Sequence, residues 1–349
     1  MNHSSTSSSK TLDSFPFPTK SFCGTVIILI IVRIVLLLNP DPLYPLAITE
    51  YDVYTLTWEH LHRKNMNEPR ILLIGSSRTQ SMPIAQFTRN LDIKKEDVSN
   101  LSRPLNTFFS IHTFIKRNPD ILNHCDLIII DVLPVQLHKN KYFTQNSAMF
   151  FRYAALNEKL LINDLPTRVF AVADTVFPFH SMRFKINEWR IGLRYTHEQV
   201  LAYNRELLMN AVSNIRKDLG QLTQFELTQR ALNSEFPKED FLEVQARSLY
   251  AVFDAVSDEA NIILIRPPFR ADIEHIIQDD PQFRESEKRL KLFVDSIDRE
   301  NVHTLWMDSP EAYNLTDDDY NDDGTHLSKA GLLKISNILS GFIKKNGLL

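Results

Sequence analysis

Short runs of apolar residues alternate along this chain with segments whose apolar positions recur at helical spacing. The runs predict five β-strands, at residues 71–75, 98–101, 126–133, 260–266 and 302–307. Helices are expected between or after them, at residues 84–90, 107–116, 285–300 and 328–344. This alternation predicts an α/β fold with a parallel sheet that carries helices on both faces.

Residues 138–255 interrupt the alternation. Helical patterns at 197–220 and 240–257 follow an aromatic-rich stretch at 170–184. We therefore expect a helical insertion packed beside the sheet of one domain that spans residues 70–349. Residues 39–69 are expected to form a connecting segment.

The N-terminal region has a different character. Residues 1–20 are polar and rich in Ser and Thr, which predicts a disordered tail. Residues 22–38, within the segment 21–38, are largely apolar and contain one charged residue, Arg33; as a helix this run of about 17 residues spans about 26 Å, at the short end of what crosses a bilayer. Lysines precede this segment and acidic residues follow it, which places the N-terminus in the cytoplasm and the C-terminal domain outside.

A cleaved signal peptide or a buried core helix would also be apolar. The segment is long for a signal sequence, and no small-residue cleavage site follows it at residues 39–42. We therefore favour a single-pass membrane anchor at 21–38.

Composition narrows the range of functions. The formal net charge is −4, and no basic stripe interleaved with aromatic residues occurs, so we expect no nucleic-acid partner. The two cysteines, Cys23 and Cys125, give neither a disulfide framework nor a metal-ligand spacing. We expect no metal and no cofactor.

Two short motifs carry candidate chemistry. Ser77 follows the first predicted strand in the turn Gly75-Ser76-Ser77, and Asp323 and His326 precede the last predicted helix. A serine hydroxyl needs a base to accept its proton, and a carboxylate can orient that base. Both motifs fall at the carboxyl ends of predicted strands, where parallel sheets bind ligands. Each motif also has an ordinary interpretation. The turn at residues 75–77 could be a plain loop, and the motif at 323–326 could be a turn with a helix N-cap at Asp323 or Thr325.

The order of these parts resembles the SGNH (GDSL-type) hydrolases, in which a serine follows the first strand and Asp-x-x-His lies near the C-terminus. The resemblance implies a flavodoxin-like three-layer α/β/α fold and a triad of Ser77, His326 and Asp323. A Gly-Ser-Ser variant behind a membrane anchor is similar to the extracytoplasmic branch of that family, which includes proteins of teichoic-acid D-alanylation and alginate O-acetylation.

The sequence departs from the family pattern in two blocks. Residues 100–107 resemble the Asn-Leu-Gly-x-x-Gly-x-Thr run, with Ser102 and Leu105 in place of its glycines. The Asn expected after the third strand is missing. The backbone amides of Ser77, Leu105 and Asn106 remain candidates for the oxyanion hole, and Arg78 and Ser102 are candidates for substrate binding. The default interpretation of Arg78 is an ordinary surface arginine.

These observations predict a membrane-anchored serine esterase or O-acyltransferase that acts on a cell-envelope polysaccharide or lipid-linked polymer. If it transfers acyl groups, the resemblance implies a multispanning membrane acyltransferase as its partner. The alternative is a non-catalytic scaffold or polysaccharide-binding subunit of an envelope acylation complex that retains a degenerate site.

Overall fold

The computed structural model describes residues 19–38, 68–102, 106–137, 154–162, 165–176, 223–236 and 243–349, and residues 199, 202, 203 and 206 besides. The chain divides into two units, residues 1–41 and 42–349. The described part of the first unit is one helix, and all the other elements belong to the second.

Five parallel strands form the central sheet, in the order β2-β1-β3-β4-β5. Their bounds are Ile71–Ile74 (β1), Val98–Asn100 (β2), Leu127–Asp131 (β3), Asn261–Arg266 (β4) and Val302–Trp306 (β5). This is the strand order of flavodoxin-like folds. Every residue of β1 and β3 is buried, because helices cover both faces, and their sequences are correspondingly apolar. The predicted α/β fold with a parallel sheet is confirmed.

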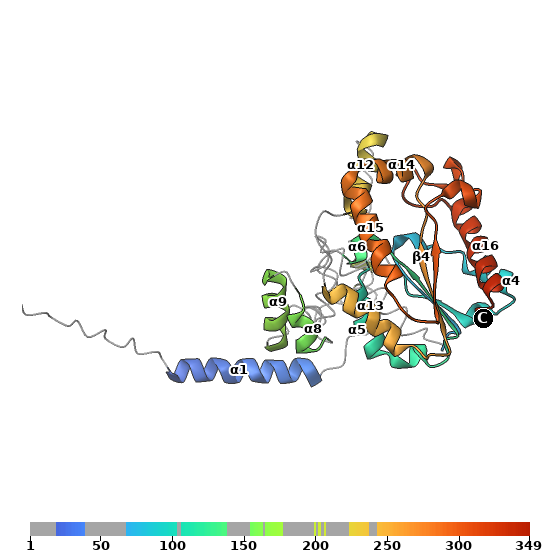
Figure 1. Ribbon diagram of the computed structural model, residues 1–349. Helices are drawn as coiled ribbons and strands as arrows, with labels where there is room; N and C mark the ends of the chain where they lie inside the picture. The colour runs from blue at the N-terminus through green and yellow to red at the C-terminus, as the bar shows by residue number, and fades with distance from the viewer. Residues whose placement is uncertain are drawn as a thin grey trace, which may run out of the picture. The chain divides into compact units, whose positions relative to one another are not determined.

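Helices lie on both sides of the sheet (Figure 1). The helices α5 (Phe108–Arg117), α13 (Glu243–Ala255) and α15 (Pro281–Asp295) share one apolar cluster with the sheet. The helices α4 (Ile84–Leu91) and α16 (Lys329–Asn346) share a second cluster with it. Alternate residues of β3 divide between the two clusters, as the two-residue period of a strand requires.

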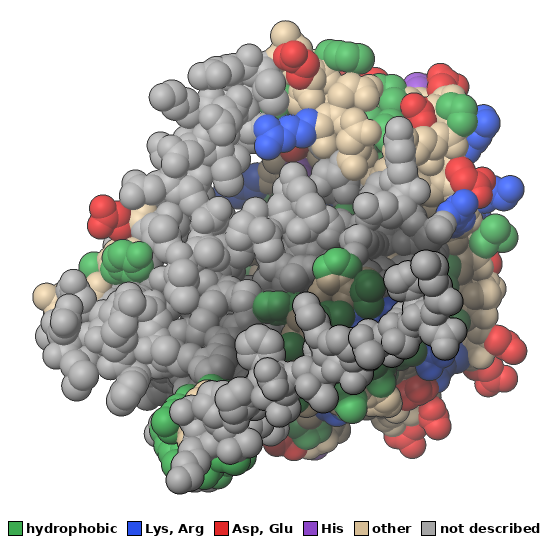
Figure 2. All heavy atoms as spheres, turned by 90° about the vertical axis from the view of Figure 1, so that its left-hand side faces the viewer, with side chains coloured by type: hydrophobic (Ala, Val, Ile, Leu, Met, Phe, Trp, Pro, Cys, Tyr) green, Lys and Arg blue, Asp and Glu red, His purple; other side chains and the backbone are tan. Residues whose placement is uncertain are grey.

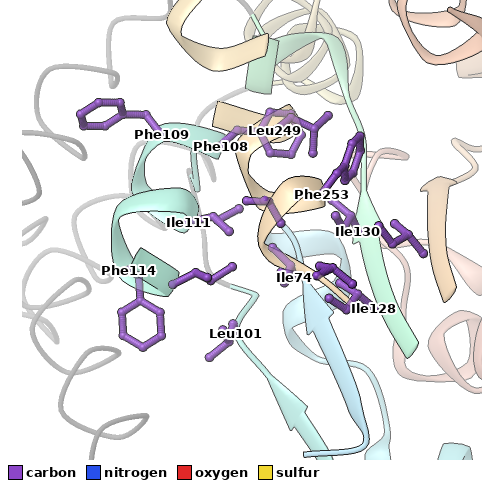
Figure 3. Close-up of a cluster of buried hydrophobic side chains, with 14 of the residues drawn as sticks. Ile74, Leu101, Phe108, Phe109, Ile111, Phe114, Ile128, Ile130, Leu249 and Phe253 are labelled. Atoms are coloured by element: carbon purple, nitrogen blue, oxygen red, sulfur yellow. The ribbon is translucent and has the colours of Figure 1, made fainter. Parts of the chain in front are cut away.

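Figure 3 shows part of the first cluster, where Phe108 and Ile111 of α5 lie beside Leu249 and Phe253 of α13. Ile128 and Ile130 of β3 complete this part of the core. The helix α13 falls inside the range 138–255 that the sequence predicts as an insertion, yet it packs against α5 in the α/β core.

A third apolar cluster includes Leu133, Phe236, Phe269 and Phe283. It involves the helices α12 (Gln224–Glu235) and α14 (Ala271–Asp279), which are not among the predicted helices. Nearby, Arg266 at the end of β4 is fully buried and pairs with Glu274 of α14 and Glu287 of α15. This buried ion pair joins the end of β4 to both helices.

The other helices described in this unit range from four to twelve residues. They are α3 (Ser77–Gln80), α6 (Pro134–Leu137), α8 (Leu156–Leu160) and α9 (Leu165–Val176), with 3₁₀ turns at Lys95–Asp97, Pro119–Leu122, Pro310–Tyr313 and Asp317–Asp319. On the face seen in Figure 2, Lys and Arg side chains are interspersed with Asp and Glu over the described surface. The described part of that face therefore carries no extended patch of one charge.

The helix α1 (Thr19–Leu38) covers the apolar segment for which we predict a membrane anchor. Within the described residues, no helix combines the length and the apolarity that crossing a membrane requires. The predicted tail at 1–20, the connecting segment at 39–69 and the helix at 197–220 lie almost entirely outside the described residues.

Candidate active site

The segment after β1 presents Ser77 at the carboxyl end of the sheet. The strand ends at Ile74, and Ser76 then caps α3, its Oγ accepting the Arg78 backbone N–H at 3.3 Å. A serine is a favoured N-cap because its oxygen accepts one of the unpaired amides of the first turn. Ser77 is therefore the first residue of α3, where its own backbone N–H has no partner within the helix.

Asp131 at the end of β3 holds this segment in place. Since Ile74 pairs with Ile130 in the sheet, the ends of β1 and β3 are level, and Asp131 lies beside the turn. Its carboxylate accepts the Ser76 backbone N–H at 2.8 and 2.9 Å and the Ser76 hydroxyl at 2.8 Å. It also accepts hydrogen bonds from Thr79 Oγ1 and Gln136 Nε2, both at 2.8 Å.

Asp131 is fully buried, and burial raises the pKa of its carboxyl although the hydrogen bonds from Ser76, Thr79 and Gln136 oppose that rise. Asp131 is not among the site residues predicted from the sequence. The sequence did offer a clue, because Asp131 is the one charged residue in the otherwise apolar, buried strand β3 and lies at its end.

Gly75 is required by the closeness of this packing. A Cβ at position 75 would lie 2.0 Å from Thr79 Oγ1 and 2.6 Å from Asp131 Oδ2. No side chain fits there while the carboxylate network stays intact.

The turn before α16 supplies the base. Asp323 Oδ1 accepts the backbone N–H groups of Thr325 and His326, each at 2.9 Å, while Gly324 adopts the left-handed region at φ 64°. Asp323 Oδ2 lies 2.7 Å from His326 Nδ1. Burial alone would raise the pKa of Asp323, but its hydrogen bonds with the His326 ring, the charge of that ring and the two backbone amides together hold the pKa below its usual value. Asp323 therefore stays ionised at neutral pH.

The two segments meet at the serine. Ser77 Oγ lies 2.9 Å from His326 Nε2. With Nδ1 donating to Asp323, Nε2 carries no proton and accepts the serine hydroxyl. The side chains of His326 and Asp323 are 32% and 31% exposed, so solvent reaches the site. The structure thus brings together the three residues predicted as a triad, in a connected Ser–His–Asp chain.

Arg78 does not lie on the surface. It is 4% exposed, and its guanidinium donates to the Thr325 carbonyl and stacks on the Phe269 ring, 4.1 Å from the centroid. The interpretation of Arg78 as an ordinary surface arginine is wrong, because tertiary contacts far along the chain bury it.

Ser102 and Asn106 contact the nucleophile segment. Ser102 is 3% exposed, and its Oγ hydrogen-bonds with Thr79 Oγ1 at 2.9 Å. Asn106 is buried and donates from Nδ2 to the Gly75 carbonyl at 3.1 Å. Leu105 lies outside the described residues.

The acidic run before the turn contains one buried member. Asp319 is buried, and its carboxylate accepts hydrogen bonds from the Thr316 N–H and from Lys334 of α16. Asp319 therefore ties this run to the last helix. In the part of the chain that the structure describes, no group of three or more His, Cys, Asp or Glu side chains could hold a metal ion.

No protein-family model and no curated protein matches this chain. One solved structure that aligns with it comes from Streptococcus pneumonia and is named a "putative platelet activating factor". The alignment covers 86% of this chain and 93% of that one, with 14% sequence identity and a TM-score of 0.37. A similarity of this degree identifies no activity, so the functional argument rests on the geometry of the site.

Proposed function

We propose that this chain is an SGNH-type serine esterase or O-acyltransferase whose catalytic residues are Ser77, His326 and Asp323. One observation carries the proposal: the continuous chain Ser77 Oγ–His326 Nε2 at 2.9 Å and His326 Nδ1–Asp323 Oδ2 at 2.7 Å. Two segments distant in sequence supply these groups at hydrogen-bonding distance, as a proton relay to and from a serine requires.

The geometry supports a two-step acyl transfer. Ser77 Oγ attacks the carbonyl carbon of an ester while His326 Nε2 takes the hydroxyl proton. His326 then returns this proton to the leaving oxygen as the ester C–O bond breaks, which leaves the acyl group on Ser77. Water or an acceptor hydroxyl attacks this acyl-enzyme, its proton passes through His326, and the Ser77 hydroxyl is restored.

Charge stabilisation during these steps comes from two directions. Ionised Asp323 stabilises the imidazolium that forms on His326. The Ser77 backbone N–H, without a helical partner, is available to the developing oxyanion, and the predicted amides of Leu105 and Asn106 would add to it. Each such donor is worth about 100- to 1000-fold in rate.

We propose that the substrate is an acyl ester on a cell-envelope polysaccharide or a lipid-linked polymer. The partial exposure of His326 and Asp323 suits an ester that a large polymer presents from outside. The resemblance in motif order and the apolar segment at 21–38 support an extracytoplasmic, membrane-anchored enzyme. If the chain transfers acyl groups, a multispanning membrane acyltransferase is the donor-side partner that the resemblance implies.

The test is turnover of p-nitrophenyl acetate by the full-length chain purified in mild detergent. We expect Ser77→Ala to lower kcat on the order of 10⁴-fold or more, because no nucleophile remains. The matched control is Ser81→Ala, at an exposed serine four residues away, which should retain the wild-type rate. Equal turnover by Ser77→Ala and wild type would refute the proposal. A well-folded wild type without turnover would favour the non-catalytic polymer-binding alternative.

A further inference from the structure

Arg78 is a buried charged group that the proposed reaction does not use directly. It follows Ser77 in α3, and its guanidinium donates to the carbonyl oxygen of Thr325. Thr325 is itself fully buried and precedes His326. The nucleophile and the base are therefore linked twice, once by their own hydrogen bond and once through their neighbours in the chain.

The second link differs from the first in its rigidity. The hydrogen bond between Ser77 and His326 must break and reform during acyl transfer. The Arg78–Thr325 bond joins a guanidinium to a backbone carbonyl, and no step of the reaction changes either group. It can keep the two segments in register while the proton moves.

The loop after β4 supports both partners of this link. Phe269 is fully buried, and its ring stacks against the Arg78 guanidinium. The Phe269 backbone N–H donates to Glu274 Oε1 at 2.9 Å, which holds the ring in place. One residue further, the Arg270 backbone N–H donates to the Gly324 carbonyl at 3.0 Å. The same loop thus holds the guanidinium on one side and the catalytic turn on the other.

We propose that Arg78 is a positioning residue that sets the distance between Ser77 Oγ and His326 Nε2. This inference rests on the proposed function, because positioning matters only if these two groups react. Arg78 does so by tying α3 to the turn at 323–326. Arginine suits this role because its planar guanidinium stacks on Phe269 while it donates in its own plane, which a lysine ammonium cannot do.

The activity test compares Arg78→Met with Arg78→Lys in the full-length chain. Displacing reacting groups by about 1 Å can cost about 100-fold in rate, so we expect kcat on p-nitrophenyl acetate to fall about 10- to 100-fold in both variants. KM should stay within about twofold of the wild type, since Arg78 does not touch the substrate. The matched control is Arg89→Met, at an exposed arginine of α4, which should retain wild-type kinetics.

A rescue experiment separates positioning from general damage. In Arg78→Ala, added guanidinium ion should restore part of kcat by occupying the space over Phe269, whereas the same concentration of sodium chloride should not. A rise in KM with unchanged kcat would make Arg78 a substrate contact and overturn the proposal. A wild-type kcat in Arg78→Met would also overturn the proposal. If neither Arg78→Met nor Arg78→Lys folded, the proposal would be overturned as well.

A spectroscopic readout keeps the inference separate from the proposed function. In the chain labelled with ¹⁵N-histidine, the Nε2 signal of His326 is assigned by its loss in His326→Gln. Ser77→Ala gives the shift of an Nε2 that has lost its serine partner. We expect the Nε2 shift in Arg78→Met to move towards that value while Arg89→Met leaves it unchanged. If the wild type turned over no ester but Arg78→Met still moved this signal, the proposed function would fail, while Arg78 would still be shown to set the distance between Ser77 and His326. An unmoved signal would overturn the positioning role.

Discussion

The closest packing in the site lies at Gly75, and Gly75→Ala tests the carboxylate network most severely. The new Cβ would lie 2.0 Å from Thr79 Oγ1, whereas ordinary contacts begin at 3.4 Å, so the two atoms must separate by about 1.4 Å. Neither Thr79 nor Asp131 can move away without losing hydrogen bonds. Thr79 Oγ1 bonds Asp131 and Ser102, and Asp131 also accepts from Ser76 and Gln136.

The expected cost follows from these contacts. Overpacking a core costs about 1–3 kcal/mol, and losing two buried hydrogen bonds adds about 1 kcal/mol each. We therefore expect Gly75→Ala to lower the free energy of unfolding by about 3–5 kcal/mol in urea titrations. The rate of Ser77 labelling by a fluorophosphonate should fall as well, because Ser76 and Ser77 move with the network.

Gly341→Ala is the matched control for this substitution. Gly341 lies inside α16, and a Cβ there would meet nothing within 4 Å. Alanine is the better helix former, so this variant should gain about 0.5–1 kcal/mol and keep the wild-type labelling rate. Wild-type stability and labelling in Gly75→Ala would refute the packing described for the nucleophile segment.

Two further substitutions test the charges around the site. Asp323→Asn should lower kcat about 10⁴-fold, since Asn does not hold or stabilise the His326 imidazolium. Because the folded protein holds the pKa of Asp323 below its ordinary value of 3.8, ionised Asp323 stabilises the wild type above that pH, and the advantage over Asp323→Asn should shrink as the pH falls below about 4. Urea titrations of both proteins between pH 6 and pH 3 measure this, and a constant difference would contradict the assignment. Glu274→Gln should lower the free energy of unfolding by about 3 kcal/mol, because Arg266 loses the charge of one of its two buried partners. The exposed pair of Glu285 and Arg289 is the control, and Glu285→Gln should cost less than about 1 kcal/mol; equal losses in the two variants would contradict the account of the buried pair.

The fold could be predicted largely because its central strands β1, β3 and β4 are buried on both faces. The continuous apolar runs of β1 and β3 have few alternatives in a chain that alternates strands with helices. The helix α14 was missed because its side chain Glu274 faces inward. A glutamate on the buried face breaks the apolar pattern that predicts a core-facing helix. Its burial is explained only by the pairing with Arg266, which the sequence pattern does not show.

The triad residues could be named from local motifs, but their supports could not. Asp131 lies 55 positions from Ser76, and Arg78 lies 247 positions from Thr325. An arginine is placed at the surface by default, whereas Arg78 is buried where its guanidinium stacks on Phe269 and donates to the Thr325 carbonyl. Long-range contacts of this kind leave no periodic trace in one sequence.

The most direct measurement of the central claim is mass spectrometry of the full-length chain after treatment with a fluorophosphonate probe. We predict a single adduct on Ser77 in the wild type and its loss in His326→Ala, because the serine is reactive only when its base is in place. A well-folded chain that carries no adduct, or an adduct that survives in His326→Ala, would contradict the assignment of Ser77, His326 and Asp323 as a working triad.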